Sequence, residues 1–300
     1  MAYSTTTLSS KGARNPHTMR RWLVASLFVL PFFLVYLIFL IYPTFRVFQL
    51  SFTDSDIAGV GGYIGIANYA KLINDPDFWS SLWHTAYFIL LTVVPNTLLG
   101  FAFALMVVRL RRLSNFVMAA FFLPNMLPVG VVRNIWLWIL NSNFGIFNNV
   151  FHSTVAWFQD PGFAMPAVAF ITIWWSVGFN MLLFVAAIQN IPKEYYEAAA
   201  LDGADGWQMF FYITWPSVWP VTSLVLVLQL IAQFKIFDQV YLLTNGGPYD
   251  TTRVLLLQLY QEAFQKQHGG YASAIAVVLL FVIVVASLIQ NRLLGNSRST

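Results

Sequence analysis

Long apolar stretches alternate with short polar ones along this chain. Six of them approach or exceed the roughly 20 apolar residues that a helix needs to cross a hydrocarbon core about 30 Å thick. These windows cover residues 22–42, 85–108, 116–140, 166–188, 218–242 and 271–289. The pattern therefore predicts an all-α integral membrane protein with six transmembrane helices, forming one domain over residues 20–293.

Two short tails flank this domain. Residues 1–19 are rich in Ser and Thr and have few apolar side chains, so we expect a disordered tail there. Residues 294–300 form the second tail. The first apolar window follows Arg20 and Arg21 but is too long for a cleaved signal and has no small-residue cleavage site, which favours an uncleaved anchor.

Composition supports a membrane chain. Apolar residues make up 58% of the sequence and charged residues only 9%, whereas soluble domains are roughly 25% charged. The absence of cysteine excludes disulfides and thiolate metal sites. The four histidines are scattered without ligand-like spacing, so we expect neither a metal site nor a cofactor in this chain.

The net charge of +4 is better explained by topology than by nucleic-acid binding. With a cytoplasmic N-terminus, most basic residues fall on the cytoplasmic side, which is the bias that orients helices during insertion. The cytoplasmic group is Lys11, Arg14, Arg20, Arg21, Arg109, Arg111, Arg112, Lys193, Arg292 and Arg298. We therefore expect a multi-pass inner-membrane protein with both termini in the cytoplasm.

A polar segment at residues 190–216 separates the fourth and fifth windows. Pro192 can open a helix there, because its missing N–H would have no partner in the first turn. Gly203 can end that helix, since glycine accepts left-handed dihedral angles without steric cost. Asp205 is placed to cap a second short helix through Phe210. The segment is thus predicted to form two short helices that meet at a bend.

Glu197, Ala198 and Ala199 of this segment are followed by Gly203, and then by Ile213 and Pro216. This spacing resembles the EAA loop of permease subunits in binding-protein-dependent ATP-binding-cassette (ABC) importers. Trp215 stands where that family usually has Leu. Downstream, FDQVYLLTNGGP at residues 237–248 resembles the carbohydrate-uptake branch, which includes the maltose, glycerol-phosphate and multiple-sugar types. The resemblance covers roughly the last two thirds of the chain.

The resemblance implies a type I importer permease fold and a set of partners. These are a second permease subunit, two cytoplasmic ATPase subunits that bind ATP and Mg²⁺, and an extracytoplasmic solute-binding protein. The chain itself has no GxxxxGK[ST] loop and is not expected to be an enzyme. The residues expected to couple it to the ATPase are Tyr196, Glu197, Ala198, Ala199, Ala200, Asp202 and Gly203.

The fourth and fifth windows offer candidate substrate contacts. A sugar needs amide or hydroxyl groups for its hydroxyls and aromatic faces for its C–H surfaces. In relatives of this family the helices flanking the coupling loop line the substrate cavity. The pathway residues expected by that analogy are Trp175, Ser176, Phe179, Asn180, Gln229, Gln233 and Ile236. Aromatic residues at this spacing are also typical of ordinary helix packing.

Three charged residues lie inside the predicted windows, where charge is costly and therefore a functional candidate. Lys235 and Asp238 are three residues apart and either neutralise one another or contact a ligand. Arg133 either pairs with a partner helix, extends to the interface or meets an anionic substrate such as a sugar phosphate or sulfonate. Pro124 and Pro128 interrupt the third window and indicate either a kink or a gate hinge.

Two other classes of function remain as alternatives. An ion-gradient-driven secondary transporter should show paired carboxylates or broken helices near the midplane, often in repeats; only Asp238 is a candidate acid within the windows. A membrane-embedded enzyme would need clustered His, Asp or Glu, and the sequence has no such cluster. The sequence therefore favours an ATP-driven sugar importer that works by alternating access.

Overall fold

The computed structural model describes residues 16–110 and 112–295, so most of the two predicted tails, 1–19 and 294–300, lies outside the described residues. The chain divides into two compact units, residues 1–49 and 50–300. The first unit contains α1 (Pro16–Tyr36), the π-helical turn η1 (Leu37–Ile41) and α2 (Tyr42–Leu50) up to Gln49. The side chains described along η1 and α2 include none that is buried.

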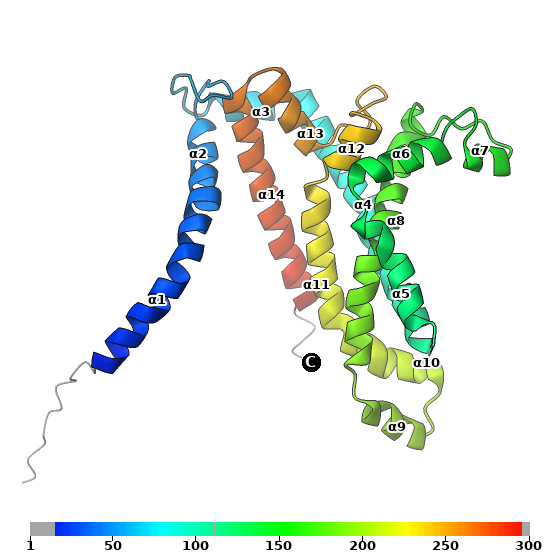
Figure 1. The fold of residues 1–300 in the computed structure, drawn as a ribbon. Helices are drawn as coiled ribbons and strands as arrows, with labels where there is room; N and C mark the ends of the chain where they lie inside the picture. The colour runs from blue at the N-terminus through cyan, green and yellow to red at the C-terminus, as the bar shows by residue number, and fades with distance from the viewer. Residues whose placement is uncertain (1–15, 111, 296–300) are drawn as a thin grey trace, which may run out of the picture. The chain divides into compact units, whose positions relative to one another are not determined.

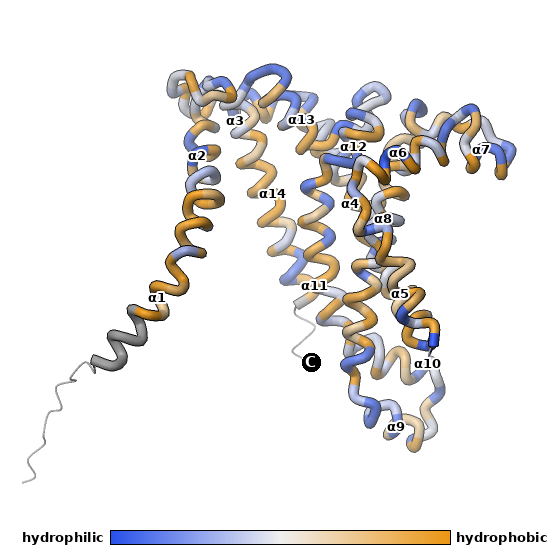
Figure 2. Tube along the Cα trace, viewed as in Figure 1, coloured by the Kyte–Doolittle hydropathy of each residue, from blue (hydrophilic) through white to orange (hydrophobic). Residues whose placement is uncertain are grey.

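The second unit is a bundle in which α4, α8, α11 and α14 are the long helices (Figure 1). Its elements are α3 (Ala67–Ile73), α4 (Pro76–Arg109), α5 (Ser114–Phe122), η2 (Leu123–Met126), α6 (Val129–Ile139), α7 (Ile146–Val150), α8 (Pro161–Gln189), α9 (Lys193–Leu201), α10 (Gly206–Met209), η3 (Phe210–Thr214), α11 (Trp215–Phe234), α12 (Asp238–Leu243), α13 (Leu255–Tyr260), η4 (Gln261–Gln265) and α14 (Gly269–Gly295). Hydrophilic residues gather in the loops at its two ends, whereas α14 is apolar over most of its length (Figure 2).

Both α4 and α8 start from an Asp-Pro pair. The carboxylate of Asp75 accepts a hydrogen bond from the N–H of Asp77 at 3.0 Å, and that of Asp160 accepts one from the N–H of Gly162 at 2.7 Å. The following proline occupies the first helical position, where its missing N–H has no cost. The two longest helices of the second unit are therefore fixed at their first residues by local sequence.

Two glycines bring the backbones of the central helices close together. A Cβ atom on Gly100 of α4 would lie 2.8 Å from Cβ of Asn180 in α8, and one on Gly178 would lie 2.0 Å from the carbonyl oxygen of Phe121 in α5. Small residues at such crossings are how membrane helices gain van der Waals contact. Helix α8 therefore packs tightly against α4 and α5.

The third predicted window, residues 116–140, is interrupted at its prolines, as the sequence indicated, but the bend is much sharper than a kink. The backbone is broken after Met126, and the helices on either side, Ser114–Met126 and Val129–Ile139, meet at an angle of 100°. Pro124 lies in η2 and Pro128 precedes α6, so both prolines named from the sequence flank the break. They produce a sharp change of direction, larger than a kink in one straight span.

Two further boundaries differ from those predicted. The fifth window, 218–242, was expected to be helical throughout, but α11 ends at Phe234 and α12 starts only at Asp238. Residues before and after this break, such as Gln233 and Asp238, therefore do not lie on one helix. The second short helix of the polar segment is not separate either, because α10 continues through η3 into α11 and forms one helical rod over Gly206–Phe234.

Among the described residues, five helices are long and apolar enough to cross a membrane, and six if the bent pair counts as one span. The same residues contain no strand, only one β-bridge between Thr53 and Tyr63. The expectation of an all-α chain with about six spans therefore agrees with the fold.

Candidate functional site

Several of the predicted pathway residues meet in a buried polar cluster, which we define as Asn96, Ser176, Asn180, Gln229 and Gln233. Asn96 of α4 donates through Nδ2 to Oγ of Ser176 at 2.8 Å and to Oε1 of Gln229 at 3.2 Å. Gln229 of α11 donates in turn to Oδ1 of Asn180 at 2.9 Å. The cluster thus joins α4, α8 and α11 by side-chain hydrogen bonds.

The polar cluster is not fully satisfied within the described residues. Oδ1 of Asn96 and Nδ2 of Asn180 are buried without a hydrogen-bond partner. Their residues are 0% and 1% exposed. A buried polar atom without a partner costs about 1–3 kcal/mol. One acceptor and one donor are therefore available inside the bundle. Gln233 completes the cluster by donating to Oε1 of Gln229 at 3.1 Å.

Asn96 was not among the residues predicted from the sequence. It follows Pro95 in the middle of an apolar window, and an amide at that depth is itself a signal of function or of helix pairing. Asn96 lies in the second window, whereas the polar residues considered from the sequence were those of the third, fourth and fifth windows. In the structure Asn96 donates two side-chain hydrogen bonds within the cluster, more than any other member donates.

The other three predicted pathway residues lie outside the polar cluster. Trp175 donates through Nε1 to the carbonyl oxygen of Leu127 at 3.2 Å, which ties α8 to the break between η2 and α6. Ile236 is buried in an apolar cluster. Phe179 is 42% exposed on the surface of the unit. Trp175 and Ile236 therefore have packing contacts in this structure, and Phe179 faces outward.

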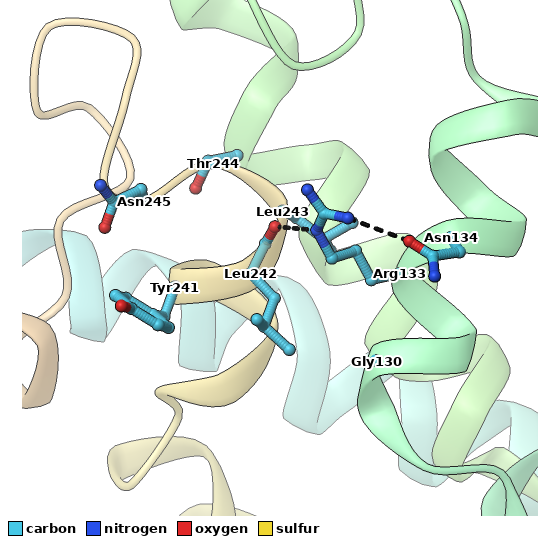
Figure 3. Close-up of a pocket in the computed structure, with 8 residues that line it drawn as sticks. All are labelled: Gly130, Arg133, Asn134, Tyr241, Leu242, Leu243, Thr244 and Asn245. Carbon is cyan, nitrogen blue, oxygen red and sulfur yellow. Dashed lines mark hydrogen bonds between the residues drawn. The ribbon is translucent and has the colours of Figure 1, made fainter.

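Arg133 lines a pocket of about 610 Å³ between α6 and α12 (Figure 3). Its Nε donates to the carbonyl oxygen of Leu242 at 2.5 Å, and Nη1 donates to Oδ1 of Asn134 at 2.9 Å. The remaining lining residues of this Arg133 pocket are Gly130, Tyr241, Leu243, Thr244 and Asn245. The guanidinium is held in place by neutral oxygens only.

Lys235 and Asp238 form no ion pair in the described part of the chain. The ion pairs found there join Arg253 to Asp77 and Asp250, and Glu262 to Lys266 and His268. Lys235 follows the last residue of α11 and Asp238 opens α12, so the two are not on one helix. Both side chains are exposed in the second unit. The prediction that Lys235 and Asp238 neutralise one another along one helix was therefore wrong.

The segment resembling an EAA loop, residues 190–216 and here called the EAA segment, projects from one end of the second unit (Figure 1). Helix α9 has no buried residue, and Leu201 at its end is 91% exposed. Gly203 has φ +81°, and no atom lies within 4 Å of the position that a Cβ would take, so its left-handed backbone, as predicted, turns the chain in open space. Tyr196 is fastened to the bundle through a 2.9 Å hydrogen bond between its hydroxyl and Oγ1 of Thr214.

Asp205 caps the helix after the bend, as the sequence predicted. Its carboxylate accepts from the N–H of Gln208 at 2.7 Å, and the side chain of Gln208 accepts from the N–H of Asp205 at 2.8 Å. This reciprocal capping box satisfies two of the free N–H groups at the helix start. The predicted coupling residues Glu197, Ala198, Ala199, Ala200 and Asp202 all lie between Tyr196 and this cap.

The opposite end of the second unit, here called the loop end, comprises residues 50–75 and 244–270. Asn68 is buried and donates to the carbonyl oxygens of Ser51 at 2.9 Å and Thr53 at 2.7 Å. The N–H of Gly270 donates to the carbonyl oxygen of Ser55 at 2.8 Å. These bonds join the loop before α3 to α3 itself and to the start of α14.

Glu262 adds an ionic contact at the loop end. Its carboxylate lies 2.6 Å from Nζ of Lys266 and 2.9 Å from Nδ1 of His268. Burial raises the pKa of this carboxyl, but the hydrogen bonds from Lys266 and His268 outweigh that effect and hold the pKa below its ordinary value. Glu262 is therefore held ionised by its two basic neighbours.

Comparison with known proteins decides the family. The family model for "Binding-protein-dependent transport system inner membrane component" matches residues 96–296. The chain belongs to this family. The predicted identity, a permease subunit of a binding-protein-dependent ABC importer, is confirmed, and in such systems this subunit is the non-catalytic membrane component.

Relatives of known name agree with the family. The chain is 35% identical over 279 residues to the probable ABC transporter permease protein YurN of Bacillus subtilis, covering 90% of this chain and 95% of that protein. It is 34% identical over 279 residues to the arabinooligosaccharides transport system permease protein AraP of the same organism, covering 90% of this chain and 88% of that one.

The fold is also similar to a solved permease. One chain of a bacterial alginate ABC transporter, solved in complex with an alginate pentasaccharide-bound periplasmic protein, matches with a TM-score of 0.84 and 25% identity, covering 95% of this chain and 98% of that chain. This match confirms the predicted type I importer permease fold. The family is an inner-membrane component, and the apolar helices fit a multi-pass membrane protein.

Proposed function

We propose that this permease is one of two transmembrane subunits of an ATP-driven importer for a sugar or a related polyol or sugar phosphate. It alternates between inward-open and outward-open states and takes its energy from two separate cytoplasmic ATPase subunits. A solute-binding protein delivers the substrate from outside. Both termini lie in the cytoplasm, which places the EAA segment on the same side as the ATPase.

The exposure of the EAA segment is the observation that carries this proposal. Helix α9 buries none of its residues, yet it ends in Leu201 and has Tyr195 near its start, two large side chains that are 91% and 58% exposed. Apolar side chains left in water favour a partner that covers them. A groove on an ATPase subunit would seat this helix by its apolar side chains, in the way amphipathic helices are bound in protein clefts.

The unsatisfied atoms of the polar cluster support a sugar as the substrate. Oδ1 of Asn96 is an unpaired acceptor and Nδ2 of Asn180 an unpaired donor, and sugar hydroxyls can serve both kinds of atom because a hydroxyl both donates and accepts. The cluster lies between α4, α8 and α11, so separating these helices during transport would open it to the substrate. The names of AraP and of the alginate transporter, both of which handle carbohydrates, support the same class.

Retention of the ATPase tests the proposal. The assembled complex is purified through a tag on this subunit, and the amount of ATPase recovered is compared between the wild type and Leu201→Asp. We expect the variant to lose most of its ATPase, because a carboxylate in an apolar groove is strongly unfavourable. Tyr249 lies at the loop end and is 90% exposed, so Tyr249→Asp is a control with matched exposure that should retain the ATPase.

A second measurement follows the coupling itself. Gly203→Val places a β-branched side chain at φ +81° and distorts the bend between α9 and α10. We expect stimulation of ATP hydrolysis by the loaded binding protein to be lost, while the variant still inserts into the membrane. If both Leu201→Asp and Gly203→Val keep full ATPase recovery and full stimulation, the EAA segment does not couple this permease to its motor.

A further inference from the structure

The guanidinium of Arg133 has unused hydrogen-bonding capacity that faces a cavity. Two of its nitrogens, Nε and Nη1, donate to Leu242 and Asn134, whereas Nη2 has no partner among the hydrogen bonds and ion pairs of the described residues. Figure 3 shows the group between α6 and the end of α12. Arg133 is only partly exposed, and the bond to Leu242 fixes its side chain. A fixed cation with free N–H groups is suited to bind an anion.

Of the two other roles considered for Arg133, pairing with a neighbouring helix is met only by the hydrogen bond from Nε to α12, which leaves Nη2 and the charge unpaired within the described residues. Arg133 does not extend into open water, because Nε is bonded to a backbone oxygen of α12. It does not pair with a carboxylate of its own unit, since the acids with ion pairs in the described chain are Asp77, Asp250 and Glu262. The positive charge is therefore not neutralised within the described part of the second unit.

The rest of the pocket suits a carbohydrate better than a bare ion. Tyr241 is among its lining residues, but its ring points away from Arg133 (Figure 3) and packs on Phe237 at 5.2 Å and on Tyr260 at 5.3 Å between ring centroids. Asn134 and Asn245 contribute two amides, and the backbone of Asn245 turns with φ +50° at the pocket wall. The amides can bond sugar hydroxyls and the guanidinium can bind an anionic group, so together they suit an anionic sugar.

We infer that the Arg133 pocket is a subsite for the anionic group of a charged carbohydrate, with Arg133 binding its carboxylate, phosphate or sulfonate oxygens. This assignment rests on the proposed sugar-import function and specifies its substrate class. A bidentate contact from Nη1 and Nη2 would hold a planar or tetrahedral oxyanion. The subsite is separate from the polar cluster, which offers only neutral groups.

Chemical protection of Arg133 tests the subsite directly. The assembled transporter is placed in nanodiscs of phosphatidylcholine and treated with phenylglyoxal, and modification of each arginine is measured by peptide mass spectrometry. We expect millimolar glucuronate or glucose 6-phosphate to slow modification of Arg133 about tenfold at saturation, and glucose to have no effect. Arg112, which is exposed, precedes α5 and does not line the pocket, reports the reagent's activity and should not change.

Three results of this experiment would overturn the assignment. Arg133 could resist the reagent without any sugar, which would mean that the sister subunit covers it. Phosphatidylglycerol discs could protect it in the same way, which would mean that a lipid phosphate is the ligand. Equal protection by glucose would mean that the charge is not recognised.

Measurements of sugar uptake distinguish a wrong subsite assignment from a wrong proposed function. We expect Arg133→Gln to lower uptake of a charged sugar about tenfold and Arg133→Lys to restore part of it, with ATPase recovery unchanged. The matched control is Arg292→Gln, which removes an exposed arginine of α14 outside the pocket and should leave uptake intact. A wild-type complex that takes up neutral sugars only would overturn the subsite alone, whereas one that takes up no sugar would overturn the proposed function.

Discussion

The two ends of the second unit are built differently. At the loop end, segments far apart in the sequence are joined by buried hydrogen bonds and by the ion pairs of Glu262 and Arg253. At the EAA end, α9 has no buried residue, and its Tyr196 hydroxyl bonds to Thr214. The capping box of Asp205 is a local contact of α10. The first end is thus closed by contacts within the chain, whereas the second leaves α9 uncovered, as the proposed docking on an ATPase subunit requires.

The largest effect is expected from Gly270→Ala. A Cβ atom there would lie 1.9 Å from the carbonyl oxygen of Thr53, so either α14 or the loop must shift, at a cost of about 3 kcal/mol. Gly206→Ala is the matched control at the EAA end, because nothing lies within 4 Å of its Cβ position. Thermal unfolding of the purified permease should show a lower Tm for the first variant only. Equal Tm values would mean that the loop end is as loosely packed as the other.

Asn68→Ala should have the next largest effect. The change leaves the carbonyl oxygens of Ser51 and Thr53 without this donor, which costs about 2 kcal/mol for buried groups. Asn74→Ala serves as control, since Asn74 makes a similar bond to Ala70 at 2.8 Å but is exposed. Urea or thermal unfolding distinguishes them. A loss no greater for Asn68 than for Asn74 would contradict the buried role.

A smaller effect is expected at the other end from Asp205→Ala. Loss of the cap costs about 1 kcal/mol and should act locally, because α10 is exposed. Hydrogen exchange of the amides of Gly206–Met209 should speed up, with the Tm nearly unchanged. Asp202→Ala should not have this effect, since Asp202 follows the end of α9 and does not cap α10. Slow exchange in both variants would argue that α10 is held by the bundle.

Acid should loosen the loop end slightly and locally. The folded-state pKa of Glu262 lies below the ordinary value of 4.5, so its contribution is complete above that pH and is lost as the pH falls through the folded-state pKa. Hydrogen exchange near residues 261–270 should therefore quicken below about pH 4.5. Glu262→Gln should remove this dependence. An unchanged acid response in the variant would place the titrating group elsewhere.

The sequence predicted the spans and the local caps well, because these depend on neighbouring residues. Pro192, Gly203 and Asp205 act within one helical turn, and their roles are as predicted. The break after Phe234 was missed because Lys235 and Asp238 were interpreted as charges inside one span, although charged residues there also fit the end of a helix. The partners of Arg133 and Asn96 come from other helices, and no pattern along the chain specifies which helices meet.

The continuity of α10, η3 and α11 has a mechanical consequence. Twenty-nine residues of unbroken helix, Gly206–Phe234, span roughly 43 Å at 1.5 Å per residue. One tip begins at the exposed bend beside Gly203, and the other carries Gln229 and Gln233. In the proposed coupling, this helix would carry movement of the bend to the hydrogen bonds that Gln229 makes with Asn96 of α4 and Asn180 of α8.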